Sequence, residues 1–251
     1  MDQLRQSLTQ ADRAAIGHRP QVLHGLGGIE KTRLAVECGL ANAEHYNALL
    51  FVSGETPEAL KTNLANLGGV LGLQQAESTE DEVRVRAALE WLKLHPGWFL
   101  IVDNLDTPEA LSAAEKMLAD LSGGHTVMTR RLANFSGLFA PLEMDVLGPD
   151  DASAFLLERT GGKRRPLPND TELAHDIAKD LGWLALALEQ AGAYIVQRRR
   201  TLLQYRKDWV SSRDAVQAWF DPSVTDYPQS FAITWQTSIA QLTPPGLRML
   251  Q

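Results

Sequence analysis

The segment at 25–32 reads GLGGIEKT and carries residue types that can bind a phosphate group. It meets the Walker A pattern, G-x-x-x-x-G-K-[ST], at Gly25, Lys31 and Thr32. Glycines let backbone N–H groups approach phosphate oxygens at the start of a helix, where the helix dipole also favours an anion. In this pattern the lysine reaches the β- and γ-phosphates and the hydroxyl group binds Mg²⁺. The segment therefore predicts a site for nucleotide phosphates.

Glu30 departs from the pattern because it replaces the second glycine. Two unit charges about 4 Å apart repel by roughly 1 kcal/mol in water and about 4 kcal/mol at an effective dielectric of 20. Repulsion of that size lowers the affinity for a phosphate by about five-fold to nearly a thousand-fold. The carboxylate could also displace the loop or partly neutralise Lys31. We therefore expect weak nucleotide binding and still weaker hydrolysis.

Asp103 ends an apolar run, WFLIVD at 98–103, and is a candidate magnesium ligand. Parallel strands bring such acids to the carboxyl edge of a sheet, where a Walker B aspartate holds Mg²⁺. We expect Asp103 to act through a bound water, with Asn104 and Asp106 as the nearest groups that could orient an attacking water. An aspartate can also close a buried strand simply as a turn former.

Two arginines follow a short apolar run, HTVMTRR at 125–131. An arginine at such a strand end can contact the γ-phosphate and so detect it. The alternative is that Arg130 and Arg131 are solvated side chains on a loop or helix, and the sequence alone leaves both interpretations open.

The elements around these residues alternate between strands and helices. A β-type run at 21–24 precedes the glycine segment, and an apolar helical pattern follows it. A glycine-rich turn can also serve packing alone, but this strand-turn-helix context favours a phosphate loop. Parallel neighbours need crossover helices, so residues 20–147 are expected to form an α/β domain with a mostly parallel sheet. Further strands are expected at 47–52, 98–103 and 126–129, and helices at 57–73, 82–94 and 108–121.

The β pattern disappears after Leu147. Pro149, Asp150 and Asp151 form a typical helix start, with acidic residues in the first turn. Residues 148–251 are therefore expected to form a small all-helical subdomain, and a lead-in helix at 3–15 is expected within residues 1–19. The helices of the subdomain are expected at 152–160, 171–180, 184–199, 201–210 and 229–241.

Length, composition and net charge exclude several classes of protein. The 251 residues, 44 % hydrophobic and 22 % charged, are typical of a globular chain with one to two domains. A net charge of −7 argues against a broad nucleic-acid surface, so the basic clusters at 130–131, 163–165 and 198–200 are not expected to bind nucleic acid, and surface charge runs of this kind are usually solvated. One cysteine, Cys38, and the lack of a signal-peptide core or an apolar run of about 18 residues predict a soluble cytoplasmic protein.

Together these residues resemble the NB-ARC domain, the nucleotide switch of the signal-transduction ATPases with numerous domains (the STAND class of P-loop NTPases). The family loop GLGGIGKT-L-A is similar to residues 25–35, its LLILDN element resembles 99–104, and its T-[ST]-R strand end resembles 129–131. The family arginine senses the γ-phosphate, which implies Arg131 by spacing, with Arg130 as the fallback. The resemblance implies a P-loop NTPase three-layer fold. It also implies nucleotide contacts at Gly25, Gly27, Gly28, Ile29, Glu30, Lys31, Thr32 and Arg33.

The helical part resembles the same family. The signature GLPLAL-EQAGAYI is similar to residues 182–195, and its proline, whose region packs against adenine, is Ala185 here. Residues 227–244 are similar to the stretch that leads into the family's winged-helix domain. The resemblance therefore implies an ARC1-like subdomain at 148–251 and the start of a linker, and it leads us to expect a fragment of a larger regulator.

The resemblance leaves two functional hypotheses. One is a nucleotide-dependent switch that binds ADP or ATP with Mg²⁺ at Thr32 and Asp103, hydrolyses slowly, and assembles with other protein domains or with itself on activation. The other is a degenerate, non-hydrolysing scaffold for protein interactions, because Glu30 and Ala185 both depart from the family pattern at nucleotide-contact positions.

Overall fold

The computed structural model describes residue 4 and residues 19–133 and 139–211 of the chain. The chain divides into two compact units. Among the described residues, the α/β unit comprises Leu4, residues 19–25 and those of Lys31–Met144, and the helical unit comprises Leu26–Glu30 and residues 145–211. The expected lead-in helix at 3–15, apart from Leu4, the expected helix at 229–241 and the family-like stretch at 227–244 lie outside the described residues.

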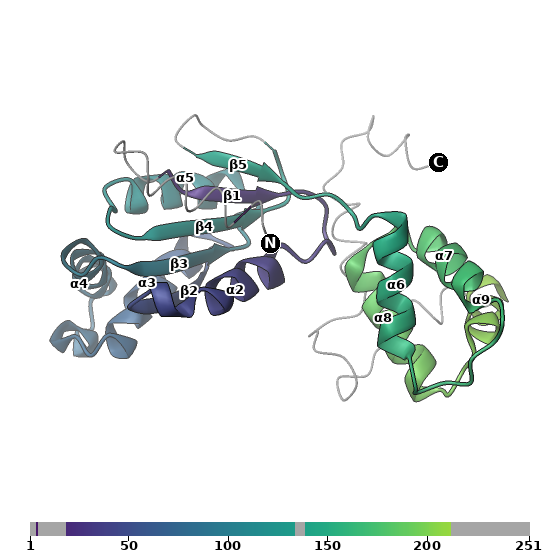
Figure 1. Cartoon of the computed structure of the whole chain (residues 1–251). Coiled ribbons are helices and arrows are strands. Elements are labelled where there is room, and N and C mark those ends of the chain that lie inside the picture. The colour runs from purple at the N-terminus through teal and green to yellow at the C-terminus, as the bar shows by residue number, and fades with distance from the viewer. Residues whose placement is uncertain (1–3, 5–18, 134–138, 212–251) are drawn as a thin grey trace. The chain divides into compact units, whose positions relative to one another are not determined.

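The α/β unit is built on a five-stranded sheet in the order β2-β3-β4-β1-β5 (Figure 1). Every paired neighbour in this sheet is parallel. The expectation of an α/β fold with a mostly parallel sheet is therefore confirmed. The strands are β1 (Gln21–His24), β2 (Ala48–Ser53), β3 (Trp98–Asp103), β4 (His125–Arg130) and β5 (Ala140–Glu143).

Four α-helices connect the strands: α2 (Lys31–Ala41), α3 (Pro57–Val70), α4 (Asp81–Leu94) and α5 (Pro108–Leu118). Two of them start with the same device, a capping threonine followed by proline. The hydroxyl oxygens of Thr56 and Thr107 accept the backbone N–H groups of Ala59 and Ala110, each at 3.1 Å. The cap accepts a backbone N–H that would otherwise be unpaired. Proline at the first helical position has no N–H and so needs no acceptor. Short 3₁₀ turns occupy Ala43–His45 and Gln74–Glu77.

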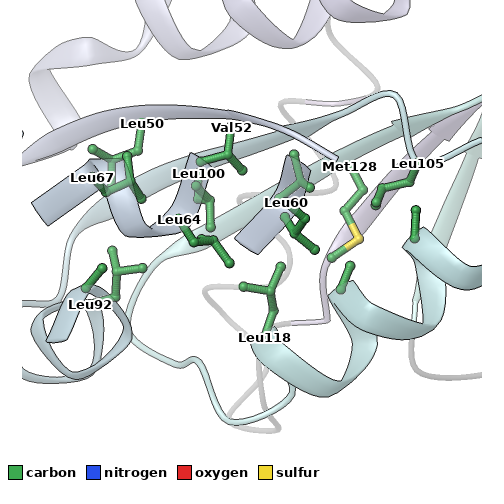
Figure 2. Packing of buried hydrophobic residues seen from close by; sticks show 14 of the residues in the cluster. Leu50, Val52, Leu60, Leu64, Leu67, Leu92, Leu100, Leu105, Leu118 and Met128 are labelled. Atoms are coloured by element: carbon green, nitrogen blue, oxygen red, sulfur yellow. The ribbon is translucent and has the colours of Figure 1, made fainter. Parts of the chain in front are cut away.

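The core lies on both faces of the sheet. On one face, Leu60 and Leu64 of α3 and Leu118 of α5 pack with Leu100 and Met128 (Figure 2). On the other face, Ala35 and Cys38 of α2 pack against a second set of buried side chains: Leu4, Leu23, Phe99, Ile101 and Val127. Helices thus cover both faces, which gives three layers and leaves the ends of the central strands to form the site.

The sequence pattern misses β5 and places some boundaries wrongly. The segment Ala140–Glu143 reads APLE, and proline disfavours a strand interior. β5 lies at the edge of the sheet, paired only with β1, and an edge strand tolerates a residue without a backbone donor. Two expected helices are shorter than the pattern suggests, because α3 ends at Val70 and α5 at Leu118.

The helical unit contains α6 (Pro149–Thr160), α7 (Asp170–Asp180), α8 (Ala185–Gln197) and α9 (Leu202–Ser211). All regular elements described after Glu143 are helical, as the sequence predicts. Leu188, Ala191 and Ile195 are buried along α8. The guanidinium of Arg159 on α6 pairs with the carboxylate of Glu189 on α8 at 2.8–2.9 Å. No helix among the described residues has both the length and the apolar character that crossing a bilayer requires.

Candidate functional site

The glycine segment joins the end of β1 to the start of α2. Gly25 and Gly28 adopt φ angles of 142° and 84°, which side-chain-bearing residues rarely adopt. The ammonium group of Lys31, the first residue of α2, donates to the carbonyl oxygen of Gly25 at 2.9 Å. The first turn of α2 therefore follows directly after the loop, and a helix N-terminus in that position is what an anion site requires.

Glu30 has a φ angle of 66°, in the left-handed region. For a residue with a Cβ atom this conformation costs roughly 1–2 kcal/mol. The Walker A pattern places glycine here, so the backbone path alone accounts for the glycine preference. The sequence indicates the charge conflict at this position, whereas the backbone strain is visible only in the structure.

Asp103 and Thr32 meet at the carboxyl end of β3. The Thr32 hydroxyl donates to Oδ1 of Asp103 at 2.6 Å, across 71 residues of sequence. One hydroxyl and one carboxylate are oxygen ligands of the kind that Mg²⁺ prefers. The two residues expected to hold the metal therefore lie within hydrogen-bonding distance of each other, beside Lys31 in the chain.

Thr129 is a site residue that the sequence reasoning missed. Its hydroxyl donates to Oδ1 of Asp103 at 2.6 Å and accepts the backbone N–H of Asn104 at 2.9 Å. The side chain is only 2 % exposed. Thr129 thus fixes both the Asp103 carboxylate and the first peptide after β3. A hydroxyl next to the two arginines was the available signal, but the pairing of β3 with β4 is needed to use it.

The segment after Asp103 is joined to the end of β4. Asn104 has a φ angle of 67°, which asparagine tolerates better than most residues. The next N–H, that of Leu105, donates to the carbonyl oxygen of Thr129 at 2.9 Å. Asn104 is half-buried beside Asp103, so it stays a candidate for orienting water.

The two arginines have different environments. Arg130, the last residue of β4, is 1 % exposed, so it is not a solvated surface side chain. Burial lowers the pKa of its guanidinium, and the carboxylates of Asp106 and Glu115 act in the opposite direction. Arg131 follows the strand and pairs with Asp106, with Nε 3.1 Å from Oδ2. Asp106 is therefore engaged by an arginine, whereas the sequence suggests it for orienting water.

His24 lies opposite Arg130 in the β1–β4 register. Burial lowers the pKa of its imidazole; Glu143 opposes this shift, and the charges of Arg130 and Lys31 add to it. The end of β1 is therefore an environment that disfavours an additional positive charge.

The remaining predicted contacts lie on the loop, on α2 and on α8. Ile29 is buried, whereas Arg33 is exposed on α2 and pairs with Glu37 at 2.9 Å. Within the helical unit, the N–H of Leu186 donates to the carbonyl oxygen of Gly28 at 3.1 Å. Ala185 is the first residue of α8. Gly27 lies in the loop between Gly25 and Gly28.

Comparison with known proteins identifies the fold. No family model matches the chain, and no curated protein matches it. Among solved structures, Cdc6p from Pyrobaculum aerophilum superposes with a TM-score of 0.55 at 16 % identity, covering 80 % of this chain and 63 % of that one. The RuvB Holliday junction branch migration motor of Thermotoga maritima gives a TM-score of 0.48 at 17 % identity, covering 82 % and 67 %.

The geometry and the Cdc6p comparison together define the class of the fold. The parallel sheet, the loop between β1 and α2, and the acid at the end of β3 are the parts of a P-loop NTPase. The α/β unit therefore has a P-loop NTPase fold, as the sequence predicts.

Proposed function

We propose that this protein is a nucleotide-binding regulatory module of the NB-ARC type that binds ADP or ATP with Mg²⁺ and hydrolyses slowly. The observation that carries the proposal is the hydrogen bond from Thr32 to Asp103, beside Lys31 at the start of α2. A lone glycine-rich turn has no need of a carboxylate from another strand, whereas a bound magnesium ion does.

Each residue has a role in this proposal. Lys31 would exchange the Gly25 carbonyl for phosphate oxygens, and Thr32 and Asp103 would hold the magnesium ion. The ion neutralises phosphate charge and orients the phosphates when it is bound. Arg131 would contact the γ-phosphate.

The regulatory part of the proposal rests on differential binding. A switch binds its two nucleotides with different free energies in two conformations, and hydrolysis resets it. The strained, acidic loop position Glu30 supports a module that depends more on binding than on turnover. We propose other protein domains or further copies of the chain as its partners, in the cytoplasm, without a nucleic acid.

Calorimetry with Mg²⁺–ADP and Mg²⁺–ATP tests the proposal. The intact chain should release or absorb measurable heat at micromolar to millimolar nucleotide, and Lys31→Ala should abolish the signal. Lys93→Ala is the matched control, because Lys93 is an exposed lysine in the last turn of α4, outside the glycine segment. Absence of both binding heat and a thermal shift at millimolar nucleotide would exclude the proposed function.

The second candidate is a scaffold that has lost nucleotide binding, and Glu30 is the observation that favours it. Replacing Glu30 by glycine restores the Walker A pattern and should raise nucleotide affinity at least ten-fold, about 1.4 kcal/mol. Binding that is detectable only in Glu30→Gly would favour the scaffold. Equal affinities would mean that Glu30 does not obstruct the phosphates.

A further inference from the structure

Asp106 contacts Arg131 at two points. Its Oδ1 accepts the backbone N–H of Arg131 at 2.7 Å, and its Oδ2 lies 3.1 Å from Nε of the same residue. The carboxylate thus fixes the peptide and one edge of the guanidinium together. The side chains are 12 % and 21 % exposed, so water screens this pair less than a surface ion pair.

One Nη atom of the guanidinium is left for a different acceptor. A guanidinium has five N–H donors, and Asp106 takes the one on Nε. Among the described residues, Nη1 of Arg131 is buried and contacts no hydrogen-bond acceptor. A buried donor without an acceptor costs free energy, so this atom marks a position where an anion would be bound favourably.

A short series of contacts connects this pair to the magnesium residues. Asp103 accepts the hydroxyl of Thr129, two residues before Arg131, and Thr129 in turn accepts the N–H of Asn104, two residues before Asp106. The carbonyl oxygen of Thr129 also accepts the N–H of Leu105. Asp106 and Arg131 therefore belong to one hydrogen-bonded network with the acid at the end of β3.

We infer that Asp106 is a positioning residue: it holds Arg131 by Nε so that the Nη groups bind the terminal phosphate of a nucleoside triphosphate. The inference rests on the proposed function and adds the residue that sets the preference for triphosphate over diphosphate. Because a diphosphate lacks the group that the Nη atoms would bind, loss of Asp106 affects the two nucleotides unequally. A purely structural role of Asp106 would weaken both alike.

The test measures the dissociation constants of Mg²⁺–ADP and of Mg²⁺ with the non-hydrolysable analogue adenylyl imidodiphosphate, by calorimetry on the intact chain. Asp106→Asn keeps an oxygen for the Arg131 N–H and removes the charge that holds Nε. The dissociation constant of the triphosphate analogue should rise at least five-fold while that of ADP changes less than two-fold. Combining Asp106→Asn with Arg131→Ala should add no further loss to that of Arg131→Ala alone.

Asp120→Asn is the matched control, because it removes the same charge from an exposed side chain just after α5. Melting temperatures without nucleotide show whether each variant is folded. An unchanged ratio of the two dissociation constants in folded Asp106→Asn overturns the inference and leaves the proposed function standing. A tighter triphosphate complex also overturns it, since Asp106 would then withhold Arg131. Failure of the unmodified chain to bind either nucleotide removes the proposed function and this inference together.

Discussion

Thr129 donates its hydroxyl hydrogen to the Asp103 carboxylate across 2.6 Å, from the strand next to the one that Asp103 ends. The same hydroxyl oxygen accepts the N–H of Asn104. One buried side chain thus orients the proposed magnesium ligand and satisfies the first peptide after the strand. The geometry of the site depends on β4 as much as on the loop that carries the recognisable motif.

Replacing Thr129 by valine should lower the free energy of unfolding by about 1–3 kcal/mol, because the isosteric side chain leaves the Asn104 N–H without its acceptor. Urea denaturation measures this change. Thr129→Ser keeps the hydroxyl and should recover most of the loss. If valine and serine are equally stable, the hydroxyl does not contribute as the structure suggests.

Glu30→Gly should raise the free energy of unfolding. Relief of the left-handed conformation contributes roughly 1–2 kcal/mol, and the greater freedom of glycine in the unfolded chain offsets about 0.5–1 kcal/mol. The expected net gain is about 1 kcal/mol. Glu30→Ala removes the charge but keeps the strain, so it should not show this gain. Denaturation of the two variants side by side separates backbone strain from charge; equal stabilities would contradict the strain.

His24 should make the protein less stable in mild acid. Its pKa is lower in the folded chain than in the unfolded one, chiefly through burial, so the unfolded chain binds more protons as the pH falls below about 6.5. The stabilisation is therefore present above pH 6.5 and declines as the pH falls towards the lowered pKa. The slope for one proton cannot exceed about 1.4 kcal/mol per pH unit.

Denaturation of His24→Gln between pH 7.5 and 5 measures this contribution. The variant should lose less stability across that range than the unmodified chain. His45→Gln serves as the control, because the side chain of His45 is exposed. Parallel pH profiles for His24→Gln and the unmodified chain would rule out a role for His24.

Asp170 should be far more important for stability than the similar ion pair made by Asp176. Asp170 accepts from Arg164 at 2.6 Å and from the N–H of Leu167 at 2.9 Å, and the Arg164 side chain is 6 % exposed. Asp170→Ala leaves a buried positive charge unpaired, which costs about 3–5 kcal/mol. Asp176 pairs with Arg206 at 2.7 Å on the surface, so Asp176→Ala should cost less than about 1 kcal/mol. Thermal or chemical denaturation that ranks the two variants equally would contradict this difference.

The strands of the sheet could be predicted because their sequences are strongly apolar. WFLIVD at 98–103 is too short for a helix of that character and too apolar for an exposed strand, and it forms β3. β5 could not be predicted in this way, since APLE is short, contains proline and alternates between half-buried and exposed side chains at the edge of the sheet. Its place is fixed by pairing with β1, which no local pattern reveals.

The contacts of the candidate site also fall into those that the sequence could predict and those that it could not. The approach of Thr32 to Asp103 could be predicted. Parallel strands end at a common edge of the sheet, so the helix start that follows β1 and the acid that ends β3 lie at the same edge. The contacts of Thr129 and Asp106 could not, because they depend on the register between β3 and β4 and on the path of three residues after β3. The sequence shows the charge of Glu30, whereas only the structure shows its φ angle.

The assignment of Leu26–Glu30 to the helical unit has a consequence for dissecting the molecule. A fragment that ends at Met144 would contain every residue of the glycine segment but would lack Leu186, whose N–H holds the Gly28 carbonyl. Such a fragment could keep its sheet and its acid and still lose the loop's conformation. A recombination between related chains that separated the glycine segment from the start of α8 would lose the same contact. The two segments should therefore be inherited together, although about 160 residues separate them.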